Sequence, residues 1–90
     1  MRTIWKYQIS RQFDLDLPMG WRVVSIAMQL DIPYLWILQT TLATSTHHFR
    51  VFATGEAIPD TATWIGTWHA ENDELVWHLF QVEPEASPKP

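Results

Sequence analysis

The sequence predicts an all-β protein, a small antiparallel β-sandwich or barrel of six to seven strands. Short runs of alternating apolar and polar residues recur along the 90-residue chain, and no convincing helical period is present. Clusters of Gly, Pro, Asp and Asn separate these runs, as turns separate strands. We expect residues 1–82 to form a single β-rich domain and the proline-rich residues 83–90 to form a flexible tail.

The expected strands span residues 3–10, 13–17, 21–30, 34–40, 47–54, 63–69 and 74–82. Two of them, 21–30 and 34–40, are apolar on both faces, which predicts a central hairpin joined by residues 31–33. A short helix within residues 19–30 is the alternative, because apolar residues there also recur three and four positions apart.

Two segments predict connections between strands. Residues 41–47 are small and polar, which is typical of a loop. Residues 55–60 cluster Gly, Pro and Asp, and we expect Gly55 to adopt a positive φ angle and Pro59 to fix the turn.

Composition limits the classes of function. Ten acidic residues outnumber six basic ones, for a net charge of -4, and this balance argues against general duplex nucleic-acid binding. The absence of Cys excludes disulfides and thiolate metal sites, and it fits a reducing compartment. No apolar run reaches signal-peptide or membrane-span length, so we expect no membrane association and a location in the cytoplasm.

The four histidines do not predict a metal site. His47 and His48 are adjacent, so in a strand they point to opposite faces. With a turn at 70–73, His69 and His78 lie about 13 Å apart along the hairpin, too far to share one zinc ion. We expect His78 to be a hydrogen-bonded core residue, and we predict neither a metal nor a cofactor.

Catalytic motifs are absent from the sequence. There is no Cys nucleophile, no Gly-x-Ser-x-Gly turn and no phosphate-binding glycine loop. Asp14 and Asp16 fall on the outward face of an amphipathic strand, where a solubilising role fits better than acid–base catalysis. We therefore predict a protein that is not an enzyme and has no catalytic residue.

Six tryptophans exceed what so small a core needs, which predicts that some of them lie in a ligand site or at a subunit interface. In this hypothesis aromatic side chains stack on a nucleotide-type ligand, cations meet its phosphates, and a loop supplies hydroxyl and backbone contacts. The predicted ligand-binding residues are Trp5, Lys6, Trp36, Arg50, Thr54, Gly55 and Trp64. Glu56 opposes an anion beside Arg50 unless its side chain turns away.

Residues 63–69, "TWIGTWH", raise a question of packing, because Trp64, Gly66 and Trp68 share one strand face with a gap at the glycine. If 70–73 is the hairpin turn, Trp77 lies opposite Gly66 and covers the gap. A register shifted by two would place Leu79 there instead.

Four short motifs stand out along the chain: "IWKY" at 4–7, "FATGEAIP" at 52–59, "WIGTW" at 64–68 and "VWHLF" at 76–80. They resemble the motifs of a family of short proteins found mostly in tailed bacteriophages and prophages. The resemblance covers about residues 4–82 and brings no established activity with it. It implies a small accessory protein in the cytoplasm of a bacterial host, and phage proteins of this size often counteract host defences.

We therefore expect a homo-oligomeric phage counter-defence protein that sequesters a nucleotide-type host immune signal without cleaving it. The second hypothesis is a protein–protein inhibitor of a host defence enzyme, which an acidic surface would allow to mimic nucleic acid. The third is a small hydrolase.

Overall fold

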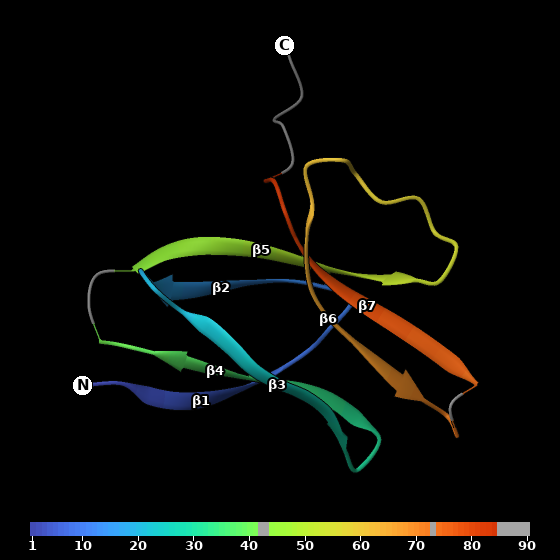
Figure 1. Ribbon diagram of the computed structural model, residues 1–90, viewed down its shortest axis with the longest axis horizontal. Helices are drawn as coiled ribbons and strands as arrows, with labels where there is room; N and C mark the ends of the chain where they lie inside the picture. Colours follow the sequence, from blue (N-terminus) through green and yellow to red (C-terminus); the bar gives the residue numbers. More distant parts are fainter. Residues whose placement is uncertain (42–43, 73, 85–90) are drawn as a thin grey trace.

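The structure, a computed structural model, describes residues 1–41, 44–72 and 74–84, and within these ranges it contains seven strands and no helix (Figure 1). The strands are β1 (Thr3–Gln8), β2 (Gln12–Pro18), β3 (Arg22–Gln29), β4 (Ile32–Gln39), β5 (Thr44–Ala53), β6 (Thr63–Ala70) and β7 (Leu75–Val82). The predicted all-β class is confirmed, and the helix considered for residues 19–30 is wrong because β3 occupies that segment. Most of the predicted tail, residues 85–90, lies outside the described residues.

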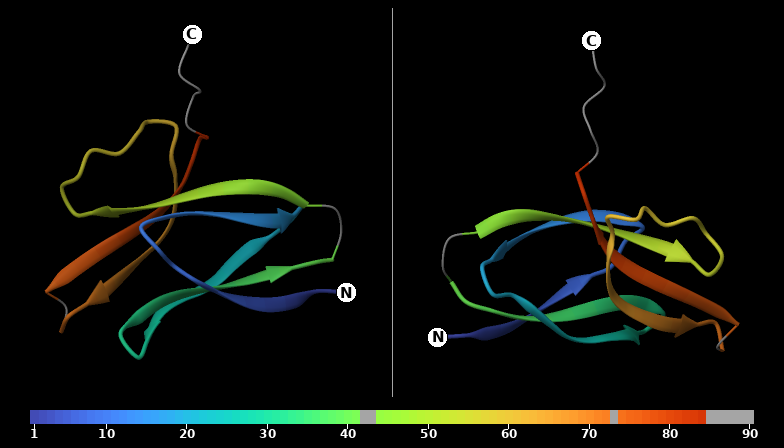
Figure 2. Two further views of the ribbon diagram at one scale, coloured as in Figure 1. Left: turned by 180° about the vertical axis from the view of Figure 1, so that it is seen from behind. Right: turned by 45° about the horizontal axis from the view of Figure 1, so that its top comes forward.

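The strands form two antiparallel sheets, one with the order β1-β4-β3 and one with the order β2-β5-β7-β6. The chain passes between them at residues 9–11, where Ile9 N donates to Pro33 O and Val51 N donates to Arg11 O, each at 2.9 Å. On the other side, β3 of the first sheet contacts β6 of the second. The turns of the β3–β4 and β6–β7 hairpins lie at the same end of the molecule (Figure 2).

The core lies between the two sheets and follows the alternation of each strand. Its buried members are Ile9, Leu17, Leu35, Ile37, Phe49, Trp68 and Leu79. Phe49 stacks on Phe13 with ring centroids 5.2 Å apart, and Trp21 meets it edge-on. Phe52 is also fully buried, but it lies on the outer face of the four-stranded sheet, against Phe80 and under the Arg50 guanidinium.

The connection predicted at 31–33 is shorter than expected. Leu30 and Asp31 form the turn, with φ angles of 50° and 67°, and β4 begins at Ile32. Two consecutive residues with positive φ match the twist of a hairpin, and neither is the Gly or Asn that usually marks such a turn. The sequence signal for this turn was therefore weak.

The loop predicted at 41–47 is wrong over residues 44–47, which begin β5, while residues 42–43 lie outside the described residues. These polar residues pair with β2, in the register Leu17↔Ser45 and Leu15↔His47. The Thr46 hydroxyl also donates to Asp16 at 2.6 Å. Pairing with an amphipathic strand thus outweighs a composition that is typical of loops.

The predicted register of the last hairpin is also wrong. Gly66 pairs with Leu79 and Trp68 pairs with Trp77, because Ala70 still belongs to β6 and pairs with Leu75. The connection therefore starts one residue later than expected, at Glu71. The pairings of Gly66 and Trp68 shift by two, as in the alternative register, and beyond a bulge Trp64 shifts by one, to Phe80. The predicted turn included Asp73, which lies outside the described residues.

The gap at Gly66 is filled from the opposite sheet. A Cβ atom added to Gly66 would overlap Ile26 Cδ1, so the Ile26 side chain of β3 lies directly over the glycine. The prediction that Trp77 covers Gly66 is wrong, and the side chain that covers it comes from a strand about forty residues earlier. Glycine at this position lets the edges of the two sheets approach each other.

This contact predicts a specific coupling between two substitutions. We expect Gly66→Ala to lower the free energy of unfolding by about 1 kcal/mol, because the Ile26 side chain must move aside. Ile26→Val removes the overlapping Cδ1 atom, so Gly66→Ala should cost less in that background, by about 0.5 kcal/mol or more. Urea unfolding of the four proteins measures the difference, and an equal cost in both backgrounds would contradict the contact.

Candidate functional site

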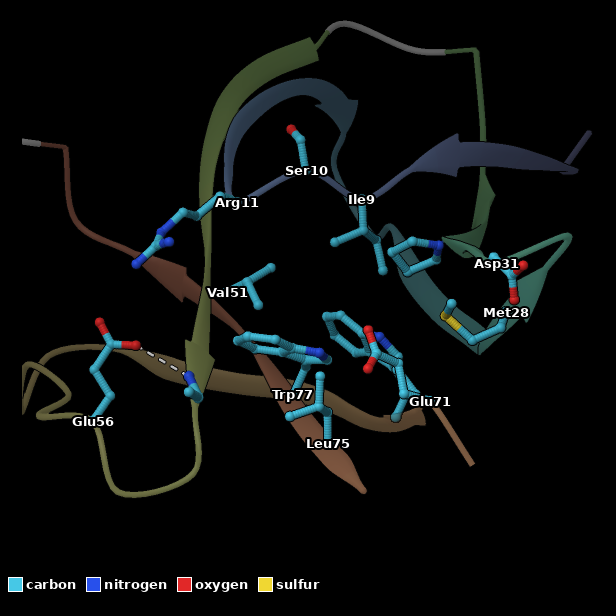
Figure 3. A pocket seen from close by; sticks show the side chains of 14 residues that line it. Ile9, Ser10, Arg11, Met28, Asp31, Val51, Glu56, Glu71, Leu75 and Trp77 are labelled. Atoms are coloured by element: carbon cyan, nitrogen blue, oxygen red, sulfur yellow. Dashed lines mark hydrogen bonds between the residues drawn. The ribbon is translucent and has the colours of Figure 1, made fainter. Parts of the chain in front are cut away.

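A cleft of about 780 Å³ opens between the two sheets at the end marked by the β3–β4 and β6–β7 turns (Figure 3). Its wall includes the bend at residues 9–11, the ends of β3, β4 and β5, and the β6–β7 hairpin. Its volume lies within the range of small-molecule sites, and the open ends of small barrels and sandwiches are common places for them.

Two indoles from neighbouring strands line the cleft. Trp68 and Trp77 are direct cross-strand partners, so both side chains point to the inner face of the four-stranded sheet. Trp68 is 6% exposed and belongs to the core, whereas Trp77 is half-buried. Further apolar surface comes from both sheets, from Ile9, Met28, Pro33, Val51, Ala53, Ala70 and Leu75.

The charges of the cleft are separated. Arg11 lies on one side, where its side chain extends outward, and Asp31 and Glu71 lie on the other (Figure 3). Glu56 also lines the cleft on the Arg11 side, but its carboxylate is paired with Arg50. Asp31 and Glu71 both occupy hairpin turns with positive φ, at 67° and 50°. Among the described residues, the side chains of Arg11, Asp31 and Glu71 have no hydrogen bond or ion pair, so all three are available to a ligand.

The seven ligand-binding residues predicted from the sequence lie on separate surfaces, and none of them lines this cleft. Lys6 and Trp36 share the outer face of the three-stranded sheet, as direct partners across β1 and β4. Trp5 lies on the other face of β1, at the sheet edge, and is 55% exposed.

The other four predicted residues belong to the four-stranded sheet and its loop. Arg50 and Trp64 lie on its outer face, where Trp64 is 60% exposed. Thr54 and Gly55 follow β5, and Gly55 has the expected positive φ, at 91°.

The expected anion position beside Arg50 is filled by the chain's own carboxylate. Glu56 accepts a hydrogen bond from Arg50 Nη2 at 3.3 Å and one from the Ala53 amide at 3.1 Å. Its side chain therefore turns toward Arg50, and the same contacts that an anion would need already hold the loop.

His78 of β7 contacts β6 and the turn after β5 through hydroxyl groups. The Thr54 hydroxyl donates to Val76 O at 3.3 Å, so we assign it as the acceptor from His78 Nε2 at 2.9 Å. Thr67 accepts from Trp64 Nε1 and donates to His78 Nδ1, both at 3.0 Å. The expected hydrogen bonding of His78 is present, but on the half-buried outer face of the sheet and not in the core.

Sequence reasoning identified Trp68 and Trp77 as sheet residues but not as cleft residues. The correct register was the missing step, because it places the two indoles side by side on the inner face. Arg11, Asp31 and Glu71 carry no local signal, since three separate connections bring them to one opening.

The comparisons with known proteins bear on the whole chain. Residues 1–90 match the family described as Domain of unknown function (DUF7352). The chain belongs to the DUF7352 family. No curated protein and no solved structure matches this DUF7352 chain.

Two further findings concern the described part of the DUF7352 chain. It contains no helix that is long and apolar enough to cross a membrane. It also contains no group of three or more His, Cys, Asp or Glu side chains placed to hold a metal ion. The chemistry of the cleft therefore depends on its indoles and its separated charges.

The contacts of Glu56 predict its importance for stability. We expect Glu56→Ala to lower the free energy of unfolding by about 1–2 kcal/mol, mainly because the Ala53 amide loses its acceptor. Glu56→Gln keeps an acceptor oxygen and should cost less, since the partly exposed ion pair to Arg50 contributes little. Urea unfolding compares the two variants, and equal losses would show that the ion pair dominates.

Proposed function

We propose that this chain is a non-catalytic binding protein that holds a nucleotide-type small molecule in the cleft between its sheets. The observation that carries the proposal is the pair of indoles, Trp68 and Trp77, in an apolar opening with opposite charges at its two sides. A nucleotide has the matching parts, a flat base and an anionic phosphate at a distance from it.

The base fits the apolar part of the cleft. Trp77 is half-buried, so it offers an accessible ring, and Trp68 supports it from the adjacent strand. Stacking of a base on an aromatic side chain contributes about 1–3 kcal/mol and tolerates different bases. Met28 and Pro33 enclose the ligand from the opposite sheet.

The separated charges orient the ligand. Carboxylates such as Asp31 and Glu71 accept hydrogen bonds from the N–H groups of a base edge. A guanidinium such as Arg11 pairs with phosphate on the other side of the opening. The reverse orientation would bring phosphate to the two carboxylates, and their repulsion disfavours it.

The residues around the cleft favour binding without cleavage. The described lining contains no Cys, His or Lys, and its one hydroxyl, on Ser10, is directed to Gln12 O at 3.5 Å. The Ser10 hydroxyl bonds a backbone carbonyl and none of the cleft's carboxylates, so it has no general base in contact with it. Together with the resemblance to tailed-phage proteins, this supports a counter-defence role in which a host immune signal is sequestered intact.

We expect nucleotides, tested one at a time, to raise the melting temperature of the protein and to be recovered unchanged after heat release. Trp77→Leu should weaken binding about tenfold because it removes the stacking surface but keeps an apolar side chain. Trp64→Leu, outside the cleft, is the matched control and should bind normally. Isothermal calorimetry measures both affinities.

Three results would contradict the proposal. Recovery of a chemically altered ligand would favour an enzyme. Equal losses in Trp64→Leu and Trp77→Leu would place the ligand elsewhere. No shift with any nucleotide, with a host protein retained through purification, would favour the inhibitor hypothesis.

The charge arrangement predicts a second, separable effect. We expect Arg11→Gln to weaken binding of the phosphorylated ligand by about tenfold while leaving the affinity for the matching nucleoside nearly unchanged. Calorimetry with the nucleotide and its nucleoside measures the two affinities. Equal losses for both ligands would show that Arg11 does not meet the phosphate.

A further inference from the structure

The outer face of the three-stranded sheet differs in charge from the rest of the protein. The strands β1, β3 and β4 carry two cations and no Asp or Glu, whereas the four-stranded sheet has Asp14 and Asp16 on β2 and the whole chain has a net charge of -4. Their register places Lys6, Arg22, Tyr34 and Trp36 on this outer face. A basic, aromatic surface thus lies on an otherwise acidic protein.

Trp36 occupies the middle of this face. It lies on the central strand, with Lys6 as its partner on one side and Ser25 on the other. The neighbouring pair on β4 and β3 is Tyr34 with Ala27. Because Ser25 and Ala27 are small, they leave the Trp36 side chain half-exposed on the side of β3.

The ammonium group of Lys6 is held in place over the face. Its Nζ atom lies 4.6 Å from the centroid of the Tyr34 ring and donates to Gln29 Oε1 at 3.1 Å. Neither contact neutralises the charge, and an ammonium group has three donors. Lys6 is therefore positioned and still able to bind an anion.

Arg22 provides a second cation beyond Trp36. It is exposed, lies opposite Leu38 on β4, and has no ion pair among the described residues. The carboxylates nearest in sequence do not share this face. Asp31 lines the cleft, and Asp14 and Asp16 bind His48 and Thr46 on the other sheet.

We propose that this face binds single-stranded nucleic acid, with a base stacked on Trp36 and backbone phosphates at Lys6 and Arg22. An open sheet face contacts a ligand from one side only, so it binds a single nucleotide weakly. A nucleic-acid strand binds more tightly, because it adds contacts at successive nucleotides. The bases of a duplex are already stacked and cannot reach the indole. The site is separate from the cleft and does not depend on the function proposed for it.

The distant acidic residues do not cancel this local charge. At physiological ionic strength the Debye length is about 8 Å, so exposed charges on the other sheet are largely screened at this face. The excess of acidic residues therefore opposes binding to nucleic acid in general, while the two cations attract a strand that lies across Trp36.

The test is fluorescence anisotropy with a labelled oligothymidylate of about twelve nucleotides, near the upper site sizes of single-strand binding folds. We expect Lys6→Glu and Arg22→Glu each to weaken binding about tenfold and to reduce the salt dependence, by about 0.7 in the slope for each lost phosphate contact. Both residues are exposed, so the variants should remain folded, which their melting curves check, although Lys6→Glu also loses the contacts with Tyr34 and Gln29. Trp36→Leu should also weaken binding about tenfold.

Arg50→Gln and Trp64→Ala are the matched controls, because they remove a cation and an indole on the outer face of the other sheet. Both should bind the oligonucleotide normally, and a duplex of equal length should bind far more weakly. The proposal is overturned by wild-type affinity in folded Lys6→Glu and Arg22→Glu proteins or by equal affinity for the duplex. It is also overturned if no binding occurs at low salt, in which case a protein partner becomes the better occupant of this face.

Discussion

The contact of Ile26 with Gly66 determines how the two sheets are joined. On one side the chain itself links them, through the bend at residues 9–11 and its two backbone hydrogen bonds. The chain crosses again at residues 19–21, from β2 into β3. Between the edges β3 and β6 the described residues show no strand pairing, and the two strands meet through side-chain packing over the glycine. A larger residue at position 66 would push the two sheets apart. Because glycine has no side chain, Ile26 can pack against its backbone, and the β3 and β6 edges stay in contact.

Closure on both sides leaves the opening at one end of the sandwich. Trp68 and Trp77 lie on the inner face near this end, because the strand that carries Gly66 also carries Trp68, two positions further on. The glycine contact and the cleft are therefore parts of one arrangement. Packing at Gly66 sets the separation of the sheets, and that separation sets the width available between the indoles and the opposite sheet.

Strand positions and strand faces could be predicted from the sequence, because a period of two is a local property. The alternation of Phe49, Val51 and Ala53 with His48, Arg50 and Phe52 matches the structure. Register could not be predicted reliably. The β6–β7 connection places Glu71 and Asn72 at positive φ. A bulge also lies between Trp64 and Gly66. Neither the turn nor the bulge has a strong sequence signal.

The candidate sites were harder to predict, because they depend on contacts between distant segments. The sequence predicts Arg50 as a phosphate ligand, but the contact of Arg50 with Glu56 forms only once the loop after β5 is folded. The overall negative charge also concealed the two cations of the three-stranded sheet, since Lys6 and Arg22 are separated in sequence and reach one face only when β1, β4 and β3 pair.

The central claim is that the cleft between the sheets is a nucleotide site. Titration of the ¹⁵N-labelled protein with single nucleotides, followed through the indole N–H signals of its six tryptophans, tests it most directly. We predict saturable shifts of the Trp68 and Trp77 signals, with the exposed Trp5 and Trp64 signals unchanged. Saturable binding that shifts the other indoles and leaves those of Trp68 and Trp77 in place would contradict the claim.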